Sequence, residues 1–269
     1  MAKQKTRIDR LLVEKGFFAS REQAKRSIMA GLVFVDDQRI DKPGTIVDAM
    51  LPIRIKGNPC PYVSRGGLKL AKALAVFDVN VQDLTAIDVG ASTGGFTDCL
   101  LQNGAAKVYA VDVGYGQLDW RLRNDPRVVV MERTNIRYLA GEQLQELVQL
   151  AVIDVAFISL TKFFENLLQL LCSDGQIIAL VKPQFEAGRE FVGKKGVVRD
   201  LNVHCTLLLR LLSQLQEFGA GLVALDYSPI RGPAGNVEYL AYFRKDRIRI
   251  DVNELVCQTV ESAKKFFKL

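Results

Sequence analysis

The segment from Ala86 to Gly95, AIDVGASTGG, constrains the fold of this chain more than any other. It reads as a buried strand that ends on Asp88, then a glycine-rich turn, then a helix that begins near Gly94. Such a turn brings backbone N–H groups at a helix N-terminus close to a ligand, because glycine adopts conformations that other residues avoid. A second strand-like run, KVYAVDVG, ends on Asp112, 24 residues after Asp88. The pattern predicts an α/β fold with a ligand-binding turn.

The spacing of these residues favours an adenosine-containing cofactor. An acidic side chain at the end of the second strand is placed to accept hydrogen bonds from ribose hydroxyls. Gly90, Gly94 and Gly95 give G-x-x-x-G-G, which is neither the dinucleotide pattern G-x-G-x-x-G nor a P-loop. The spacing therefore favours S-adenosylmethionine; the alternative is an ordinary tight turn of an α/β protein.

Strand-like runs alternate with helical ones through the rest of the chain. They cover residues 85–89, 107–113, 127–131, 150–155, 175–181, 221–228 and 238–244. This rhythm predicts a doubly wound, largely parallel sheet. Apolar residues from Val252 to Phe267 predict an amphipathic helix that packs on the sheet or the linker, or else binds a partner or a membrane surface.

Composition argues against several classes of protein. No apolar run reaches the ~18 residues of a membrane span, and the first ten residues have no secretory apolar region, so we expect a cytoplasmic protein without a membrane partner. Five scattered cysteines and a single histidine, His204, argue against a disulfide framework, a metal site and a His-dependent hydrolase. We expect His204 to be structural.

The first 60 residues hold most of the net charge of +6, with 12 Lys or Arg against seven Asp or Glu. Ile8, Leu11 and Leu12 share one helical face, and a Ser20–Gln23 capping signature precedes a second helix. We expect a basic domain over residues 1–58 and a linker over 59–64, where prolines interrupt any helix. The remaining residues, 65–269, would form the larger domain.

This N-terminal stretch, RIDRLLVEKGFFASREQAKRSIMAGLVFVDDQRI, resembles an S4 domain, a small α+β RNA-binding module. In that family the two-helix face binds structured RNA mainly through its backbone and shape. Arg21 and Lys25, at i, i+4 spacing, would form a stripe that meets successive phosphates. The RNA-binding candidates of this domain are Arg7, Arg10, Arg21 and Lys25.

Polar residues that follow apolar strands supply the candidate chemistry. Asp154 and Lys182 each follow four or more apolar residues, and the carboxyl ends of parallel strands meet at one edge of a sheet. An ion pair that caps a strand end is the alternative to a catalytic role. Lys69 and Glu238 would complete a mixed-charge cluster. By themselves, however, Lys69 reads as a surface helix lysine and Glu238 as a strand residue.

Across nearly the whole chain, SRGGLKL, GASTGGFTD, DVGYGQL, RNDPRV, VKPQFE and GNVEYL resemble the TlyA (hemolysin A) family. Its members are ribosomal RNA 2′-O-methyltransferases with an FtsJ-like catalytic domain, so the resemblance implies a seven-stranded class I methyltransferase sheet. FtsJ-like enzymes carry a Lys-Asp-Lys-Glu tetrad. The matching residues here are Lys69, Asp154, Lys182 and Glu238.

The resemblance implies a role for each of these residues. Lys182 would be the base or would orient the 2′-oxygen, Asp154 would lie by the methyl-donor centre, and Lys69 and Glu238 would tune charge and hold the ribose. Asp112 would bind the cofactor ribose, and Asn135 stands where FtsJ has an aspartate near adenine. The methionine part of S-adenosylmethionine would lie against Gly90, Ala91, Ser92, Thr93, Gly94, Gly95 and Phe96.

Further candidates lie in loops near the mouth of this site. Phe157 either stacks on a displaced base or packs in the core. Loop cations that would extend the RNA track are Arg65, Arg133, Arg137, Arg189 and Lys194.

The expected function is S-adenosylmethionine-dependent 2′-O-methylation of cytidine in 23S and 16S ribosomal RNA, with ribosomal subunits as partners. A non-catalytic RNA-binding assembly factor and a membrane-active hemolysin are the alternatives. The target nucleotide and the oligomeric state stay open.

Overall fold

The computed structural model describes residues 5–18, 20–56 and 60–269. The chain separates into two compact units, Met1–Pro61 and Tyr62–Leu269. The limits expected for the domains and the linker stay predictions, and the first linker residue, Pro59, lies outside the described residues. Each unit is described by itself.

The N-terminal unit packs two short helices on small antiparallel sheets. The sequence-predicted capping of the second helix is present, since the Ser20 hydroxyl accepts a hydrogen bond from the Gln23 N–H at 3.3 Å. Ile8, Leu12, Ile28 and Val33 are fully buried between the layers. The elements are β1 (Lys5–Arg7), α1 (Ile8–Glu14), α2 (Arg21–Met29), β2 (Val33–Val35), β3 (Gln38–Ile40), β4 (Ile46–Asp48) and β5 (Ile53–Ile55). Strand β1 pairs with β4, and β2 pairs with both β3 and β5.

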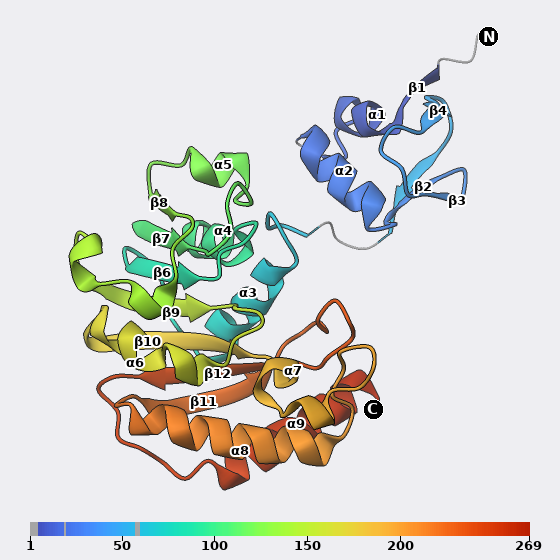
Figure 1. Cartoon of the computed structure of the whole chain (residues 1–269). Helices are drawn as coiled ribbons and strands as arrows, with labels where there is room; N and C mark the ends of the chain where they lie inside the picture. Colours follow the sequence, from blue (N-terminus) through green and yellow to red (C-terminus); the bar gives the residue numbers. More distant parts are fainter. Residues whose placement is uncertain (1–4, 19, 57–59) are drawn as a thin grey trace. The chain divides into compact units, whose positions relative to one another are not determined.

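The C-terminal unit is built on a seven-stranded sheet with the order β11-β12-β10-β9-β6-β7-β8 (Figure 1). Its strands are β6 (Thr85–Val89), β7 (Lys107–Val111), β8 (Val128–Met131), β9 (Val148–Ile153), β10 (Leu171–Val181), β11 (Gly221–Tyr227) and β12 (Tyr239–Arg244). Strand β12 runs antiparallel to both of its neighbours, and the other pairings are parallel. The predicted seven-stranded, largely parallel sheet is therefore confirmed.

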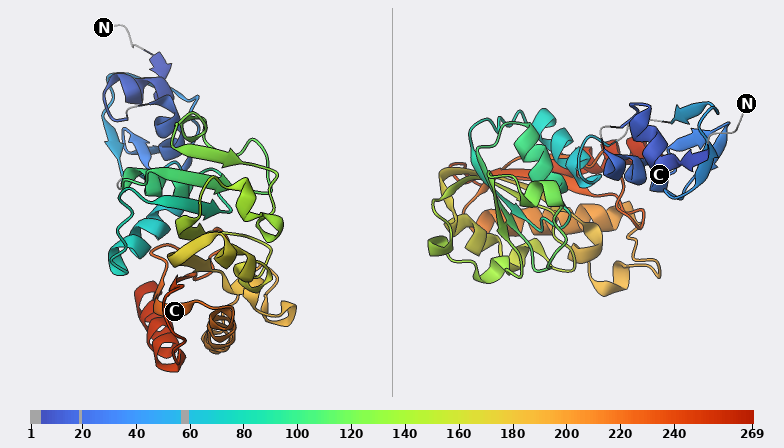
Figure 2. Two further views of the ribbon diagram at one scale, coloured as in Figure 1. Left: turned by 90° about the vertical axis from the view of Figure 1, so that its left-hand side faces the viewer. Right: turned by 90° about the horizontal axis from the view of Figure 1, so that it is seen from above.

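Helices cover both faces of this sheet, because successive strand residues are apolar on both sides. In β6, Ala86 belongs to the buried cluster that includes residues of α3 and α4, whereas Ile87 and Val89 belong to the cluster that includes residues of α6, α8 and α9 on the opposite face (Figures 1 and 2). The helices are α3 (Gly66–Val76), α4 (Gly95–Gln102), α5 (Trp120–Arg123), α6 (Phe164–Gln169), α7 (Pro183–Glu186), α8 (Leu201–Glu217) and α9 (Asn253–Phe267). Short 3₁₀ turns are η1 (Ile136–Tyr138), η2 (Gly141–Gln143), η3 (Leu160–Lys162) and η4 (Arg189–Phe191).

Helix α9 is the predicted amphipathic C-terminal helix. Its buried side chains, Val256, Thr259, Val260 and Ala263, face β11 and α8. The helix therefore packs on the sheet, which was one of the expected alternatives. Among the described helices of the chain, none is long and apolar enough to cross a lipid bilayer.

Strand register brings the ends of several strands to one place, which we call the carboxyl edge. Val89 of β6 lies opposite Val111 of β7 and Ile153 of β9. Because β12 is antiparallel, its first residue, Tyr239, lies opposite Val181, the last residue of β10. Residues that follow β6, β7, β9 and β10 therefore meet the residue that precedes β12.

Candidate active site

A cleft of about 730 Å³ opens at the carboxyl edge of the C-terminal unit. Its size is that of a small-molecule site. The sequence-predicted residues that line it are Arg65, Lys69, Gly90, Ala91, Ser92, Thr93, Gly95, Phe96, Asp112, Asn135, Asp154, Phe157, Lys182 and Glu238. Residues more than 170 positions apart in the sequence thus meet in one cavity.

The four tetrad residues form two ion pairs in the cleft. Lys182 Nζ lies 2.5 Å from Asp154 Oδ1, and Lys69 Nζ lies 2.6 Å from Glu238 Oε2. Lys69 and Glu238 are buried, so the expectation of a surface lysine on α3 is wrong. Buried charges require partners of this kind, because an uncompensated charge away from water is costly.

The two pairs also interact with each other electrostatically. Burial raises the pKa of the Glu238 carboxyl above its usual value, Lys69 and then Lys182 lower it, and Asp154 raises it. Glu238 therefore senses both partners of the other pair. The four side chains thus form one charge cluster in the cleft.

The glycine turn after β6 fits against the same cluster. Gly90 has φ +85°, and a Cβ at this position would lie 2.7 Å from the Asp154 carbonyl oxygen. Only glycine meets both conditions. Gly94, by contrast, has φ +92° and packs against Leu122. It does not line the cleft as the neighbouring turn residues do.

Asp88, near the end of β6, holds the start of the helix that follows this turn. Its fully buried Oδ2 accepts hydrogen bonds from the Thr97 N–H at 2.9 Å and the Thr97 hydroxyl at 2.7 Å. Among the described residues no group donates a hydrogen bond to its other oxygen, Oδ1. Burial raises the pKa of Asp88 to about 7. Because Thr97 lies in the first turn of α4, Asp88 fixes that helix N-terminus beside the cleft.

Asp112 presents its carboxylate to the cleft from the end of β7. Its Oδ2 accepts a hydrogen bond from the Ser92 N–H at 2.8 Å, and its Oδ1 accepts one from the Gly114 N–H at 2.7 Å. Each carboxylate oxygen has two acceptor sites, so further sites remain for ligand hydroxyls. Asn135 lines the same wall, where its side-chain oxygen caps η1 by accepting from the Arg137 N–H at 3.1 Å.

Phe157 stands at the cleft with 91% of its surface exposed, so the alternative of core packing is wrong. Its φ of +64° is costly for a bulky residue. Its ring lies 5.0 Å from that of Phe185, on the helix that follows Lys182. The structure therefore holds an exposed aromatic ring next to the two ion pairs.

The other loop cations lie outside the cleft. The Arg133 guanidinium lies over the Tyr115 ring at 4.2 Å, and that of Arg137 lies over the Tyr138 ring at 5.3 Å. Arg189 and Lys194 are exposed in the segment after α7. Of the five predicted loop cations, only Arg65 lines the cleft in the described chain.

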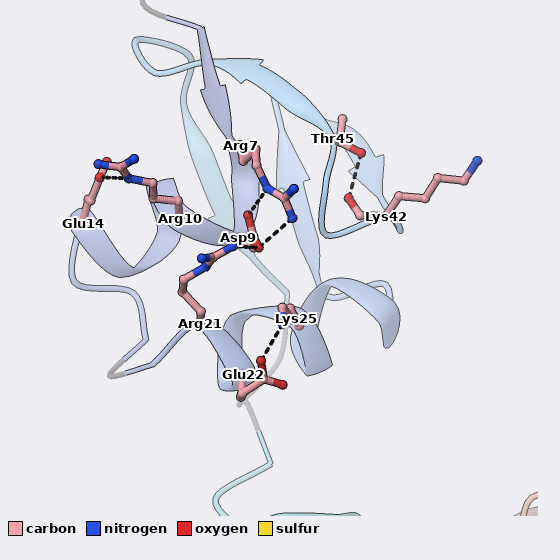
Figure 3. Close-up of polar contacts among 9 residues, drawn as sticks. All are labelled: Arg7, Asp9, Arg10, Glu14, Arg21, Glu22, Lys25, Lys42 and Thr45. Carbon is pink, nitrogen blue, oxygen red and sulfur yellow. Dashed lines mark hydrogen bonds and ion pairs between the residues drawn. The ribbon is translucent and has the colours of Figure 1, made fainter.

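The predicted RNA-binding cations of the N-terminal unit are all engaged by carboxylates (Figure 3). Arg7 Nε and Arg21 Nη2 lie 3.0 Å and 2.7 Å from the two oxygens of fully buried Asp9, and they hold its pKa far below the usual value. Arg10 pairs with Glu14 at 2.7 Å, and Lys25 pairs with Glu22 at 2.5 Å. The expected stripe of Arg21 and Lys25 does not take these pairings into account, since Arg21 contacts Asp9 and Lys25 contacts Glu22.

His204 lies in the core of the C-terminal unit, as expected for a structural residue. Its Nδ1 shares a hydrogen bond with the Tyr239 hydroxyl at 2.8 Å, and its Nε2 shares one with the Val198 carbonyl at 2.9 Å. Burial lowers its pKa, which favours the neutral ring.

Sequence reasoning missed Arg231, which lines the cleft from the segment between β11 and β12. Arg231 could have been found from its position seven residues before Glu238, because residues close in sequence to one cleft residue often line the same cleft. Gln117 and Thr134, which also line the cleft, follow β7 and β8 and were missed in the same way.

Comparison with known proteins agrees with this architecture. The model of the FtsJ-like methyltransferase family matches residues 62–245, and that of the S4 domain matches residues 6–53. The Bacillus subtilis protein YqxC, whose name proposes an rRNA methyltransferase, is 55% identical over 90% of this chain and 86% of its own. The 16S/23S rRNA (cytidine-2′-O)-methyltransferase TlyA of Mycobacterium tuberculosis is 45% identical over 90% of both chains.

A solved structure from Streptococcus thermophilus, described as a candidate hemolysin, is 48% identical and superposes with a TM-score of 0.79. The match covers 99% of this chain and 98% of that one. Two domain models and near full-length relatives thus agree with the two-unit organisation and the seven-stranded sheet. The chain belongs to the TlyA (hemolysin A) family of methyltransferases, with an S4 domain ahead of an FtsJ-like catalytic domain.

Proposed function

We propose that this protein transfers a methyl group from S-adenosylmethionine to the 2′-hydroxyl of cytidine in ribosomal RNA. The observation that carries the proposal is the pairing of Lys182 with Asp154 and of Lys69 with Glu238 beside a glycine turn. Relatives that align over most of the chain are named for this reaction on 23S rRNA or on both 16S and 23S rRNA. We extend that substrate to this chain.

The cleft suits an adenosine-containing sulfonium cofactor. The Asp112 carboxylate, fixed by two backbone N–H groups, would accept hydrogen bonds from the ribose hydroxyls. Asn135 would contact the adenine, and the turn from Gly90 to Phe96 would hold the methionine part. S-adenosylmethionine supplies an electrophilic methyl group on a good leaving group, so the protein has mainly to position the nucleophile.

Lys182 would act on the attacking 2′-oxygen, either by accepting its proton as an amine or by orienting it as an ammonium donor. Asp154, 2.5 Å from Lys182 Nζ, fixes the direction of that group. Lys69 and Glu238 would hold the target ribose and balance the charge that develops there. The exposed ring of Phe157 would stack on the base of the displaced nucleotide.

The N-terminal unit would bind structured rRNA, and ribosomal subunits in the cytoplasm would be the partners. In our proposal, RNA phosphates meet the four cations whose side chains Figure 3 draws, namely Arg7, Arg10, Arg21 and Lys25. Phosphate contacts of this kind would position the target nucleotide without reading its sequence.

Methyl transfer from labelled S-adenosylmethionine to isolated 30S and 50S subunits and to naked rRNA tests the proposal. The expected product is 2′-O-methylcytidine after digestion to nucleosides. Tight RNA binding without transfer would instead identify a non-catalytic assembly factor. Leakage of vesicles without transfer would favour the membrane-active alternative.

A further inference from the structure

Arg231 differs from the two lysines of the cleft in its partners. Lys69 and Lys182 each contact a carboxylate, whereas among the described residues no carboxylate lies within ion-pair distance of Arg231. Its Nη2 instead donates a hydrogen bond to the backbone carbonyl of Phe267 at 2.8 Å. An arginine that lines a cleft without a neutralising acid retains its full positive charge for a ligand.

The backbone around Arg231 is held close to Glu238. Ser228 N–H donates to the Glu238 carbonyl at 2.8 Å, and Gly232 N–H donates to the Asn236 carbonyl at 2.9 Å. A Cβ on Gly232 would lie 2.6 Å from Glu238 Oε1, so Gly232, the residue after Arg231, packs directly on the Glu238 carboxylate of the charge cluster. The loop therefore carries Arg231 at a fixed place beside the ion pairs.

The end of α9 fixes the direction of the Arg231 side chain. In addition to the carbonyl contact, the guanidinium lies 5.1 Å from the centre of the Phe267 ring, a cation–π contact. The Phe267 ring packs with Phe266 at 4.9 Å and with Tyr227 at 6.2 Å. Phe266 belongs to the same aromatic cluster but makes no ring contact with the arginine.

We propose that Arg231 binds a backbone phosphate of the RNA strand next to the target ribose, and that Phe267 positions it. The proposal rests on the proposed function, because it concerns the substrate of the same cleft. A planar guanidinium forms paired hydrogen bonds to phosphate oxygens, and its remaining N–H groups are available beyond the one given to Phe267. The C-terminal helix thereby acts on RNA binding rather than on cofactor binding.

The test measures methyl transfer to rRNA with the full-length protein and its Arg231→Ala variant. We expect the KM for RNA to rise about tenfold while the affinity for S-adenosylhomocysteine stays unchanged, with a salt-dependence slope lower by about one. Arg231→Lys keeps the charge and should retain the slope while raising KM less. An unchanged KM and slope in Arg231→Ala would overturn the proposal. Absence of transfer by the unsubstituted protein would instead contradict the proposed function.

Two phenylalanine variants test the positioning role. Phe267→Ala should raise the KM for RNA severalfold, whereas Phe266→Ala removes a ring of equal size and should leave KM unchanged. Phe267→Ala should add nothing to Arg231→Ala, because Phe267 acts on RNA binding only through Arg231. Equal effects of the two phenylalanine variants, or additive effects with Arg231→Ala, would overturn the role assigned to Phe267.

Discussion

Lys182 and Asp154 extend from neighbouring parallel strands, and their charged groups meet 2.5 Å apart at the edge of the sheet. Each follows a run of at least four apolar, buried strand residues, so the sheet itself places the pair. The geometry fixes the lysine Nζ at the cleft, where the proposed mechanism needs a group that acts on the 2′-oxygen.

Lys182→Ala should lower the rate of methyl transfer by at least 10³-fold, because the group that acts on the 2′-oxygen is lost. Lys182→Arg should also be inactive, since a guanidinium neither accepts a proton nor matches the ammonium geometry. Isothermal titration with S-adenosylhomocysteine should give wild-type affinity for both. Substantial turnover by Lys182→Ala would remove this residue from the mechanism.

Gly90→Ala should weaken binding of S-adenosylhomocysteine by at least tenfold. The new Cβ would lie only 2.7 Å from the Asp154 carbonyl oxygen, so the Asp154 backbone would have to move. Gly219→Ala is a matched control. Gly219 also has positive φ, +110°, but its Cβ would meet no atom within 4 Å. The control should cost about 1–3 kcal/mol of stability through backbone strain and leave binding intact. Equal losses of affinity would show that backbone strain, and not the contact with Asp154, explains the effect.

Asp88→Asn should change how stability depends on pH. The pKa of Asp88 is raised from 3.8 to about 7, so the folded state binds its proton more tightly than the unfolded state does. Its stabilising contribution is complete below about pH 4 and is lost as pH rises through about 7. Relative to the unsubstituted protein, the variant should therefore gain about 2–3 kcal/mol between pH 5 and pH 8. Urea unfolding at both pH values measures it, and a constant difference would contradict the assigned burial effect.

Arg10 and Lys25 can be substituted without disturbing the fold, because their carboxylate partners are exposed, whereas the partner of Arg21 is buried. Arg10→Gln with Lys25→Gln removes two exposed ion pairs that contribute little stability, so the melting temperature should hold. The slope of log Kd for rRNA against log salt concentration should fall by about two.

Glu14→Gln with Glu22→Gln is the opposite control, which frees the same cations and should tighten RNA binding. Arg21→Glu, in contrast, places a second carboxylate beside buried Asp9 and should unfold this unit. If both double variants leave the salt slope unchanged, Arg10 and Lys25 do not contact RNA.

Much of the fold follows from local sequence pattern. Apolar runs separated by turn residues predicted the strands, and the Ser20–Gln23 signature predicted a helix start that the structure contains. The end of a parallel strand is likewise visible in sequence, which is why Asp154 and Lys182 were found together.

Other parts of the site depend on long-range register. Glu238 precedes an antiparallel strand, and only its pairing with β10 places it at the carboxyl edge. Lys69 looked like a surface lysine because its partner lies 169 residues away. The contact of Arg21 with Asp9 spans 12 residues, so helical spacing alone could not predict it. Arg231 was missed because its contact with Phe267 arises only when α9 packs on the sheet.

Mapping of 2′-O-methylated nucleotides in the rRNA of cells that lack this protein tests the central claim most directly. The account predicts that 2′-O-methylcytidine is lost at specific rRNA positions, returns with the unsubstituted protein and stays absent with Lys182→Ala. An unchanged methylation map in the deletion strain, or full restoration by Lys182→Ala, would contradict it.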